Sequence, residues 1–283
     1  MDCTIALAQV DAVLGDLRRN VALHVEQVER ARSQGASMVV FPELSLTGYS
    51  VKDSTWDLAM RTGAPPADLI PLLDASRHIP VIAGGIEEGE DFSLYNAAFL
   101  FEGGTVRSLH RKIYPPTYGM FEELRHFSPG DSVRAHDTSI GRVGVLICED
   151  LWHPSLPYLI AQDGAGVLIA LVASPTRLAG DDAELTVATV NRENHRVYAR
   201  LLSLYLVFCN RVGYEDGVNF WGGSAVIGPD GDPVAAAPLF TEHLLLASLR
   251  DEELRRTRRF SRHFLDERPE LLLRELKRLW DRS

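Results

Sequence analysis

Three reactive side chains stand at the ends of segments whose composition is typical of buried strands. Cys148 ends "RVGVLIC", Glu43 follows "MVVFP", and Lys112 ends "LHRK". Open α/β sheets carry their sites at strand ends and in the loops that follow. Each residue alone has an ordinary explanation, since a strand-end cysteine is usually packing and a Glu or Lys usually faces solvent. For Cys148 that explanation weakens, because Glu149 and Asp150 follow it directly.

Together the three groups suffice for acyl transfer. A thiol with an ordinary pKa of about 8.5 must lose its proton to attack carbon, so it needs a base or a cation beside it. The carboxylate of Glu43 is suited to take that proton and to return it to an amine leaving group. The ammonium group of Lys112 is suited to stabilise the oxyanion of a tetrahedral intermediate, helped by the backbone N–H of Glu149. This chemistry requires neither a metal nor an organic cofactor.

The elements that must position these groups alternate between apolar strands and amphipathic helices, which indicates sheets covered by helices. Gly103 and Gly104 join two segments as a hairpin, so the sheets are expected to be mixed rather than purely parallel. The expected strands cover residues 4–10, 37–43, 80–88, 94–104, 105–112, 142–148, 166–174, 204–213, 223–231 and 233–240. The expected helices cover residues 17–31, 68–78, 154–165 and 183–203.

The chain is expected to form one domain over residues 1–249, because no linker or internal repeat divides that stretch. The segment 250–283 differs in character, with eleven Arg or Lys against eight Asp or Glu. Its sequence "PELLLRELKRLW" is helical in pattern. We expect a C-terminal helical tail that packs on the domain or on a partner subunit.

Overall composition excludes several classes of function. The 283 residues carry a formal net charge of −10, which favours neither nucleic acid nor an anionic membrane as a partner. Three cysteines, Cys3, Cys148 and Cys209, form no disulfide framework and point to a reducing compartment, so a cytoplasmic protein is expected. The nine histidines show no spacing typical of a metal site.

Four motifs in register resemble the nitrilase superfamily of carbon–nitrogen hydrolases over nearly the whole chain. They are "FPELSLTGY", "HRKIYP", "GVLICEDLW" and "NRVGYEDGVNFWGGSAVIGPDG". The resemblance implies an αββα sandwich and covalent amide hydrolysis, with Glu43 as general base, Lys112 as stabiliser of the intermediate and Cys148 as nucleophile. It also implies that Glu123, in "GMFEELRHF", helps to position the lysine, while its neighbour Glu122 is a surface residue.

The residues after the cysteine narrow the resemblance to one group of relatives. Nitrile-cleaving members tend to have Cys-Trp-Glu, whereas "CEDLW" is similar to the glutamine-amidase domains of NAD synthetases. By this resemblance Tyr49 and Tyr118 line the pocket, although simple packing explains two tyrosines equally well. Glu149 matches a residue that meets the amino group of the substrate, and Ser174 matches a further pocket residue.

Two departures from that pattern bear on the substrate. The sequence has no Ser-Gly-Gly-x-Asp-Ser loop and no P-loop, so we expect that any ammonia released is not consumed within this chain, and a partner that would consume it is not identified. The segment "SPTRLAGDD" has Asp181 where the amidase domains carry a cation near the substrate carboxylate. Arg177 is the candidate replacement for that cation.

The leading hypothesis is therefore a cofactor-free amidase that acts on a small-molecule carboxamide, either glutamine-like or an ω-amide. N-carbamoyl amide hydrolysis or acyl transfer on the same three residues is the first alternative, and a catalytically inactive binding scaffold is the second. A Cys-His hydrolase that uses His153 is a third, although Pro154 favours a loop position for that histidine. We also expect a homodimer or a higher homo-oligomer, in which the tail extends over a partner.

Overall fold

The computed structural model describes residues 1–176 and 185–282, and two six-stranded sheets hold most of its strands. In the first sheet, β1, β2 and β3 run parallel, and the outer strands pair antiparallel. Its strands lie in the order β14 (His243–Arg250), β1 (Asp2–Gln9), β2 (Met38–Val40), β3 (Val81–Glu88), β4 (Leu94–Glu102) and β5 (Thr105–Arg111). This sheet carries Glu43 beyond β2 and Lys112 beyond β5.

The second sheet carries Cys148 beyond its strand β7. The strands β7, β8 and β9 run parallel, and antiparallel strands flank them on both sides. The order is β13 (Pro233–Ala236), β12 (Ala225–Ile227), β9 (Tyr205–Asn210), β8 (Val167–Val172), β7 (Gly141–Ile147) and β6 (Ala135–Thr138). A separate hairpin of β10 (Val212–Glu215) and β11 (Val218–Trp221) follows β9.

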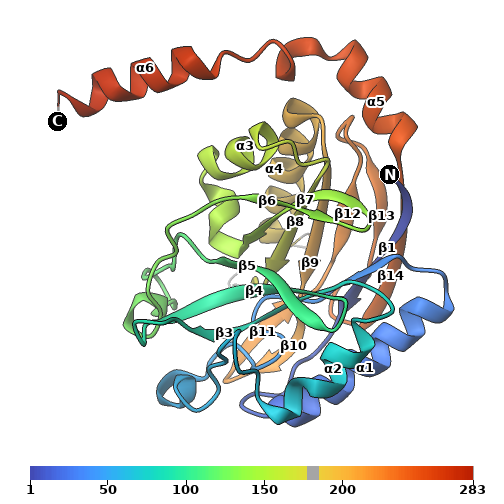
Figure 1. Ribbon diagram of the computed structural model, residues 1–283, viewed down its shortest axis with the longest axis vertical. Coiled ribbons are helices and arrows are strands. Elements are labelled where there is room, and N and C mark those ends of the chain that lie inside the picture. Colours follow the sequence, from blue (N-terminus) through green and yellow to red (C-terminus); the bar gives the residue numbers. More distant parts are fainter. Residues whose placement is uncertain (177–184, 283) are drawn as a thin grey trace.

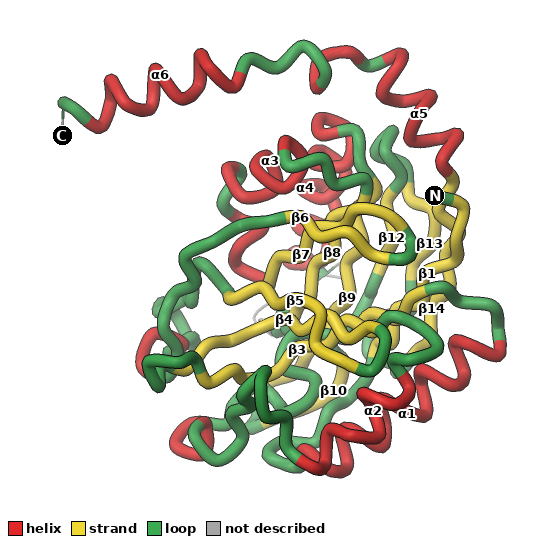
Figure 2. Tube along the Cα trace, viewed as in Figure 1, coloured by secondary structure: helices red, strands yellow, loops and turns green. Residues whose placement is uncertain are grey.

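The two sheets pack face to face, with helices on both outer faces (Figures 1 and 2). In β1 the side chains alternate: Ile5 and Leu7 pack against strands of the second sheet, while Ala6 and Ala8 pack under the first pair of helices. This alternation follows from the two-residue period of a strand and buries both faces of the sheet. The structure confirms the αββα sandwich of mixed sheets.

Two pairs of helices form the outer layers. α1 and α2 pack on the first sheet, and α3 and α4 pack on the second (Figure 1). The Asp16 side chain caps the start of α1, accepting a hydrogen bond from the backbone N–H of Arg19 at 2.9 Å. The four helices are α1 (Leu17–Ser33), α2 (Ile70–Ala75), α3 (Ser155–Gln162) and α4 (Thr186–Leu202).

The C-terminal segment leaves the sandwich as two further helices, α5 (Asp251–Phe260) and α6 (Pro269–Trp280). The root of this segment is anchored, because Arg258 donates hydrogen bonds to backbone oxygens of Ser203 and Ala165. In contrast α6, all of which the structure describes, has no buried residue and projects away from the sandwich (Figure 1). Within the described ranges, no helix is long and apolar enough to cross a membrane.

Several elements differ from the sequence pattern. The strand series does not end at residues 233–240, because β14 follows and pairs antiparallel with β1 over its whole length. The strands β6 and β11 are likewise unpredicted, and the stretch 204–213 is divided between β9 and β10. The helix expected over 68–78 is a 3₁₀ turn, Ala67–Leu69, followed by the six residues of α2. Pro71 fits only the first turn of such a helix, since it lacks a backbone N–H.

Candidate active site

Lys112 is the centre of the candidate site and comes directly after the last residue of β5. Its Nζ donates a hydrogen bond to Glu43 Oε1 at 2.8 Å and another to Glu123 Oε1 at 2.7 Å. The three side chains are 1%, 0% and 5% exposed, respectively. Burying a charge is costly unless it is paired, and here one ammonium group is paired with two carboxylates.

The loop after β2 holds Glu43 in place. Its Oε1 also accepts from Asn96 Nδ2 at 2.8 Å, and its Oε2 accepts from the backbone N–H of Ala173 at 2.9 Å. Gly84 on β3 permits this loop to lie close, because a Cβ at that position would come within 2.3 Å of the backbone nitrogen of Leu44. Glu43 therefore has both oxygens engaged and a fixed orientation.

Glu123 lies on the 3₁₀ helix η3 (Glu123–Arg125) and joins the same cluster from a third segment. Besides Lys112, its Oε1 accepts from the Tyr49 hydroxyl at 2.6 Å, and its Oε2 accepts from Asn96 Nδ2 at 3.3 Å. The neighbouring side chain of Glu122 is 71% exposed, as expected of a surface residue. Tyr49, predicted to line the pocket, directs its hydroxyl at Glu123.

Cys148 begins the 3₁₀ helix η4 (Cys148–Trp152) immediately after β7. Its backbone φ of +44° lies in the left-handed region, which costs a non-glycine residue about 1–2 kcal/mol. A strained turn from strand to helix of this kind lifts the nucleophile above the sheet in α/β hydrolases. The side chain is half-buried, whereas Cys209 lies fully buried in β9.

The charges around the thiol determine its ionisation. Burial raises the pKa of the Cys148 thiol well above its usual value, and the carboxylate of Glu43 raises it further, while the Lys112 ammonium group opposes both. Burial also raises the pKa of Glu123, assisted by the charge of Glu43 and opposed by Lys112. For Lys112 itself burial favours the neutral form, but the carboxylates of Glu123 and Glu43 outweigh it and raise its pKa. The thiol is consequently protonated at neutral pH, and the lysine is charged.

The other predicted substrate-binding residues that the structure describes make hydrogen bonds outside the cluster around Lys112. The Tyr118 hydroxyl donates to Glu149 Oε2 at 2.8 Å, in a half-exposed position beside the cysteine turn. Ser174 is buried beyond β8, and its backbone N–H donates to Asn210 Oδ1 at 2.9 Å. Arg177 lies outside the described residues, so its role stays a prediction from sequence.

The residue patterns did not single out Asn96 or Asp150, and both are buried beside the three reactive groups. Asn96 donates from one amide nitrogen to both Glu43 and Glu123, so it links the two carboxylates. The signal for it was a lone polar residue within the apolar strand "LYNAAFLF". His153, the alternative base, stacks on Tyr114 with ring centroids 3.4 Å apart.

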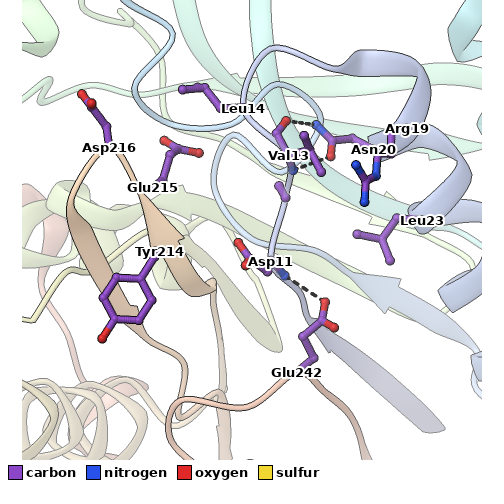
Figure 3. A pocket seen from close by; sticks show the side chains of 11 residues that line it. Asp11, Val13, Leu14, Arg19, Asn20, Leu23, Tyr214, Glu215, Asp216 and Glu242 are labelled. Atoms are coloured by element: carbon purple, nitrogen blue, oxygen red, sulfur yellow. Dashed lines mark hydrogen bonds between the residues drawn. The ribbon is translucent and has the colours of Figure 1, made fainter.

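A hollow in the surface lies between the loop after β1, α1 and the β10–β11 hairpin (Figure 3). It has a volume of about 600 Å³, and none of the catalytic or substrate-binding residues predicted from sequence lines it. One of its lining residues, Glu215, accepts hydrogen bonds from the backbone N–H groups of Tyr49 and Ser50 at 2.9 and 2.6 Å. This hollow therefore lies beside Glu215, which holds the loop that contains Tyr49, and the reactive groups do not line it.

The arrangement brings a buried carboxylate and a buried ammonium group together with a cysteine on a strained turn, and side chains of these types are suited to acyl transfer through the thiol. Among the described residues, no group of three or more His, Cys, Asp or Glu side chains is placed to hold a metal ion. A family model of carbon-nitrogen hydrolases matches residues 4–259. The chain belongs to this family, within the nitrilase superfamily.

Curated relatives that match the chain include glutamine-dependent NAD(+) synthetases. The protein from Thermotoga maritima is 32% identical over 255 residues, which are 89% of this chain and 43% of that protein. The protein from Acinetobacter baylyi is 30% identical over 256 residues, 89% of this chain and 45% of that protein. The chain thus spans less than half the length of these relatives.

Solved structures that share the fold include an NAD+ synthetase and an amidase. A glutamine-dependent NAD+ synthetase from Acinetobacter baumannii superposes with a TM-score of 0.79 at 27% identity, covering 90% of this chain and 47% of that one. A mutant amidase from Nesterenkonia sp. AN1 superposes with a TM-score of 0.78 at 26% identity, covering 96% of each chain. That amidase carries the acetamide moiety of fluoroacetamide, added covalently at its active site cysteine.

Proposed function

We propose that this carbon–nitrogen hydrolase is an amidase that converts a small-molecule carboxamide to a carboxylate and ammonia through a thioester on Cys148. The main observation behind the proposal is the buried Lys112 ammonium group, which donates hydrogen bonds to Glu43 and Glu123 at 2.8 and 2.7 Å. Its positive charge also favours the ionised form of the Cys148 thiol, because it opposes the burial that raises the pKa of that group. Similarity over 96% of the chain to an amidase with a covalently modified cysteine supports it.

In the first half of the reaction the amide loses its nitrogen. The Cys148 thiol gives its proton to the Glu43 carboxylate as the sulfur bonds to the amide carbon, and the carbonyl electrons move to oxygen. Two N–H bonds of Lys112 point at carboxylates, and the third stabilises this oxyanion together with the backbone N–H of Glu149. The C=O bond then re-forms, the C–N bond breaks, and Glu43 returns the proton to the departing ammonia.

In the second half water replaces ammonia. Water adds to the thioester carbon and gives a proton to Glu43, and the new oxyanion meets the same donors. Collapse breaks the C–S bond, and Glu43 returns the proton to the sulfur of Cys148. The carboxylic acid leaves, and the site is restored without any other reactant.

We propose a glutamine-like or ω-amide substrate. The Tyr118 hydroxyl orients the Glu149 carboxylate beside the cysteine turn, which suits recognition of a substrate amino group. The relatives named as glutamine-dependent synthetases support glutamine itself. Arg177 is the proposed partner of a substrate carboxylate. Its replacement should then raise KM for carboxylate-bearing amides and leave KM for neutral amides unchanged.

An ammonia-release screen tests the function directly. The panel contains glutamine, asparagine, ω-amides of dicarboxylates, aliphatic amides and N-carbamoyl amino acids. We expect release from a carboxamide, loss of release in Cys148→Ala, and retention in Cys3→Ala, which replaces another half-buried cysteine. Release from carbamoyl compounds alone would establish the alternative chemistry on the same residues, and transfer to added amines would establish an acyltransferase.

Iodoacetamide labelling separates an enzyme from an inactive scaffold. The half-buried Cys148 has a base beside it, whereas the sulfur of Cys209 is fully buried in the core. An enzyme is expected to be labelled faster at Cys148 than at Cys209. Equal labelling, together with no ammonia from any amide, would favour the scaffold.

We further propose that the protein acts in the cytoplasm as a homodimer or higher homo-oligomer and passes ammonia to a partner that consumes it. The exposed helix α6 supports self-association, because Leu273, Leu276 and Trp280 are 71%, 54% and 81% exposed on it.

A further inference from the structure

We propose that Asp150 is a positioning residue that holds the Lys112 strand end and the Cys148 turn at a fixed separation. The inference rests on the proposed amidase function, since it concerns the geometry of that reaction. Asp150 lies two residues after the cysteine and is 0% exposed. It touches neither the lysine ammonium group nor the thiol in any hydrogen bond of the described residues, so it acts through the backbone.

Each oxygen of this carboxylate serves a different part of the chain. Asp150 Oδ1 accepts from the backbone N–H groups of Ile113 and Tyr114, both at 3.0 Å, which are the two residues after Lys112. Asp150 Oδ2 accepts from the backbone N–H of Ile147 at 3.1 Å, which is the residue before Cys148. One buried carboxylate therefore ties the backbone next to the lysine to the backbone next to the nucleophile.

These two backbones belong to different sheets. Lys112 follows β5 at the edge of the first sheet, and Cys148 follows β7 in the second. Packing between sheets is less directional than hydrogen bonding within one, so a specific tie is needed to fix the position of one strand end against the other. A fourth donor, His110 Nε2, reaches Asp150 Oδ2 from β5 at 2.9 Å and adds a second link across the same gap.

A role confined to the local turn explains only part of this arrangement. Capping the short helix η4 requires the single bond from Ile147, which is one of the four that Asp150 accepts. The other three come from β5 and the residues after Lys112. Because all four partners are donors, only an acceptor with two free oxygens satisfies both sides.

The test compares Asp150→Asn with Asp163→Asn in the full chain. In Asp150→Asn one oxygen becomes an amide donor, so either the lysine side or the cysteine side loses its bonds in each orientation of the amide. Asp163 also accepts from a backbone N–H, that of Ala135 at 2.7 Å, and from Arg142. Those partners lie on β6 and β7 of one sheet, so its replacement leaves the separation of the two sheets unchanged.

We expect Asp150→Asn to lower kcat about 100-fold with KM within about threefold, because small misplacements of reacting groups reduce the rate far more than binding. The pH profile of Cys148 alkylation by iodoacetamide should move to higher pH, since Lys112 then stabilises the thiolate less. Asp163→Asn should leave kcat and the profile unchanged. Equal kcat values in the two variants, with an unmoved alkylation profile, would overturn the proposal.

Two further measurements keep the result interpretable. If Asp150→Asn does not fold, His110→Gln removes one link of the same tie, and it should shift kcat and the alkylation profile in the same directions by a smaller factor. An unchanged profile in that variant would also overturn the proposal. If the wild-type chain releases no ammonia from any amide, the amidase function fails, yet the alkylation profiles still test the position of Lys112 against Cys148.

Discussion

Replacing Glu123 by Gln tests whether the buried charges set the reactivity of the site. Glu123 shares Lys112 with Glu43 and lies within the electrostatic field of the thiol. The substitution keeps the size of the side chain, and one oxygen remains to accept from Lys112 and from the Tyr49 hydroxyl. Only the charge and the longer contact with Asn96, at 3.3 Å, are lost.

The expected loss of activity follows from the hydrogen bond that changes. A hydrogen bond to a charged group contributes about 1.5–3 kcal/mol, and the neutral amide retains part of it. At about 1.4 kcal/mol for each tenfold change, the upper bound is roughly 150-fold in kcat/KM. Glu123 raises the pKa of the Cys148 thiol, so the neutral variant should have a lower thiol pKa. Glu123→Gln is thus expected to be a poorer amidase with a more acidic thiol.

The adjacent residue provides a matched control. Glu122 is 71% exposed and lies 3.9 Å from Arg125, so Glu122→Gln removes the same charge from the surface. Its effect should stay within about 0.5 kcal/mol, as is usual for surface substitutions. Steady-state kinetics on an amide that the enzyme hydrolyses measure kcat/KM, and alkylation rates of Cys148 from about pH 6 to about pH 10 measure the thiol pKa. Equal kcat/KM values for the two variants, or a thiol pKa that rises in Glu123→Gln, would refute the electrostatic reasoning.

Four further predictions address other parts of the molecule. Tyr49→Phe should lower kcat about 5- to 30-fold with KM unchanged, because a bond of about 1–2 kcal/mol to Glu123 is lost, whereas a rise in KM alone would mean that the hydroxyl binds substrate. His153→Gln should keep activity within about twofold, since the ring stacks on Tyr114 and no step uses it as a base. Burial lowers the pKa of His24 from 6.5 to about 4, so the folded state binds a proton at this imidazole more weakly than the unfolded state does. The free energy of unfolding is therefore highest above pH 6.5 and falls by roughly 3 kcal/mol as the pH approaches 4. Urea unfolding of His24→Gln should show a smaller fall over the same pH range. Removal of residues 266–283 should lower the number of subunits per particle, obtained by analytical ultracentrifugation from the particle mass and the mass of the truncated chain, whereas an unchanged number would mean that α6 does not hold subunits together.

Local sequence patterns predicted the site residues that directly follow an apolar strand. A polar residue directly after an apolar strand lies at a sheet edge, and that rule located Glu43, Lys112 and Cys148. The pattern of the family motifs added Glu123 and Tyr49. Their proposed roles remain predictions, but the structure places the side chains of Glu43, Lys112, Glu123 and Tyr49 within one hydrogen-bonded cluster.

Features that depend on distant pairing were beyond these patterns. β14 pairs with β1 across about 240 residues, and nothing in "HLLLASLR" specifies that partner. The same holds for Asn96, which in the sequence is a lone polar residue within an apolar strand. The structure explains it, because Glu43 and Glu123 from two other segments accept hydrogen bonds from its side chain. A buried polar group is satisfied by its three-dimensional neighbours, so its purpose is readable only after folding.

The count of charges in the site constrains how the thiol is activated. With a neutral thiol, the buried cluster holds two carboxylates and one ammonium group. Losing the thiol proton to solvent would add a second uncompensated negative charge to a dry environment, which is the costly form. Transfer of that proton to Glu43 leaves the total charge unchanged, because a carboxylate is neutralised as the thiolate forms. The free enzyme should therefore show no thiolate absorbance near neutral pH when its ultraviolet spectrum is compared with that of Cys148→Ala. A thiolate band at pH 7 would instead mean that the sulfur is already ionised in the free enzyme, before any substrate binds.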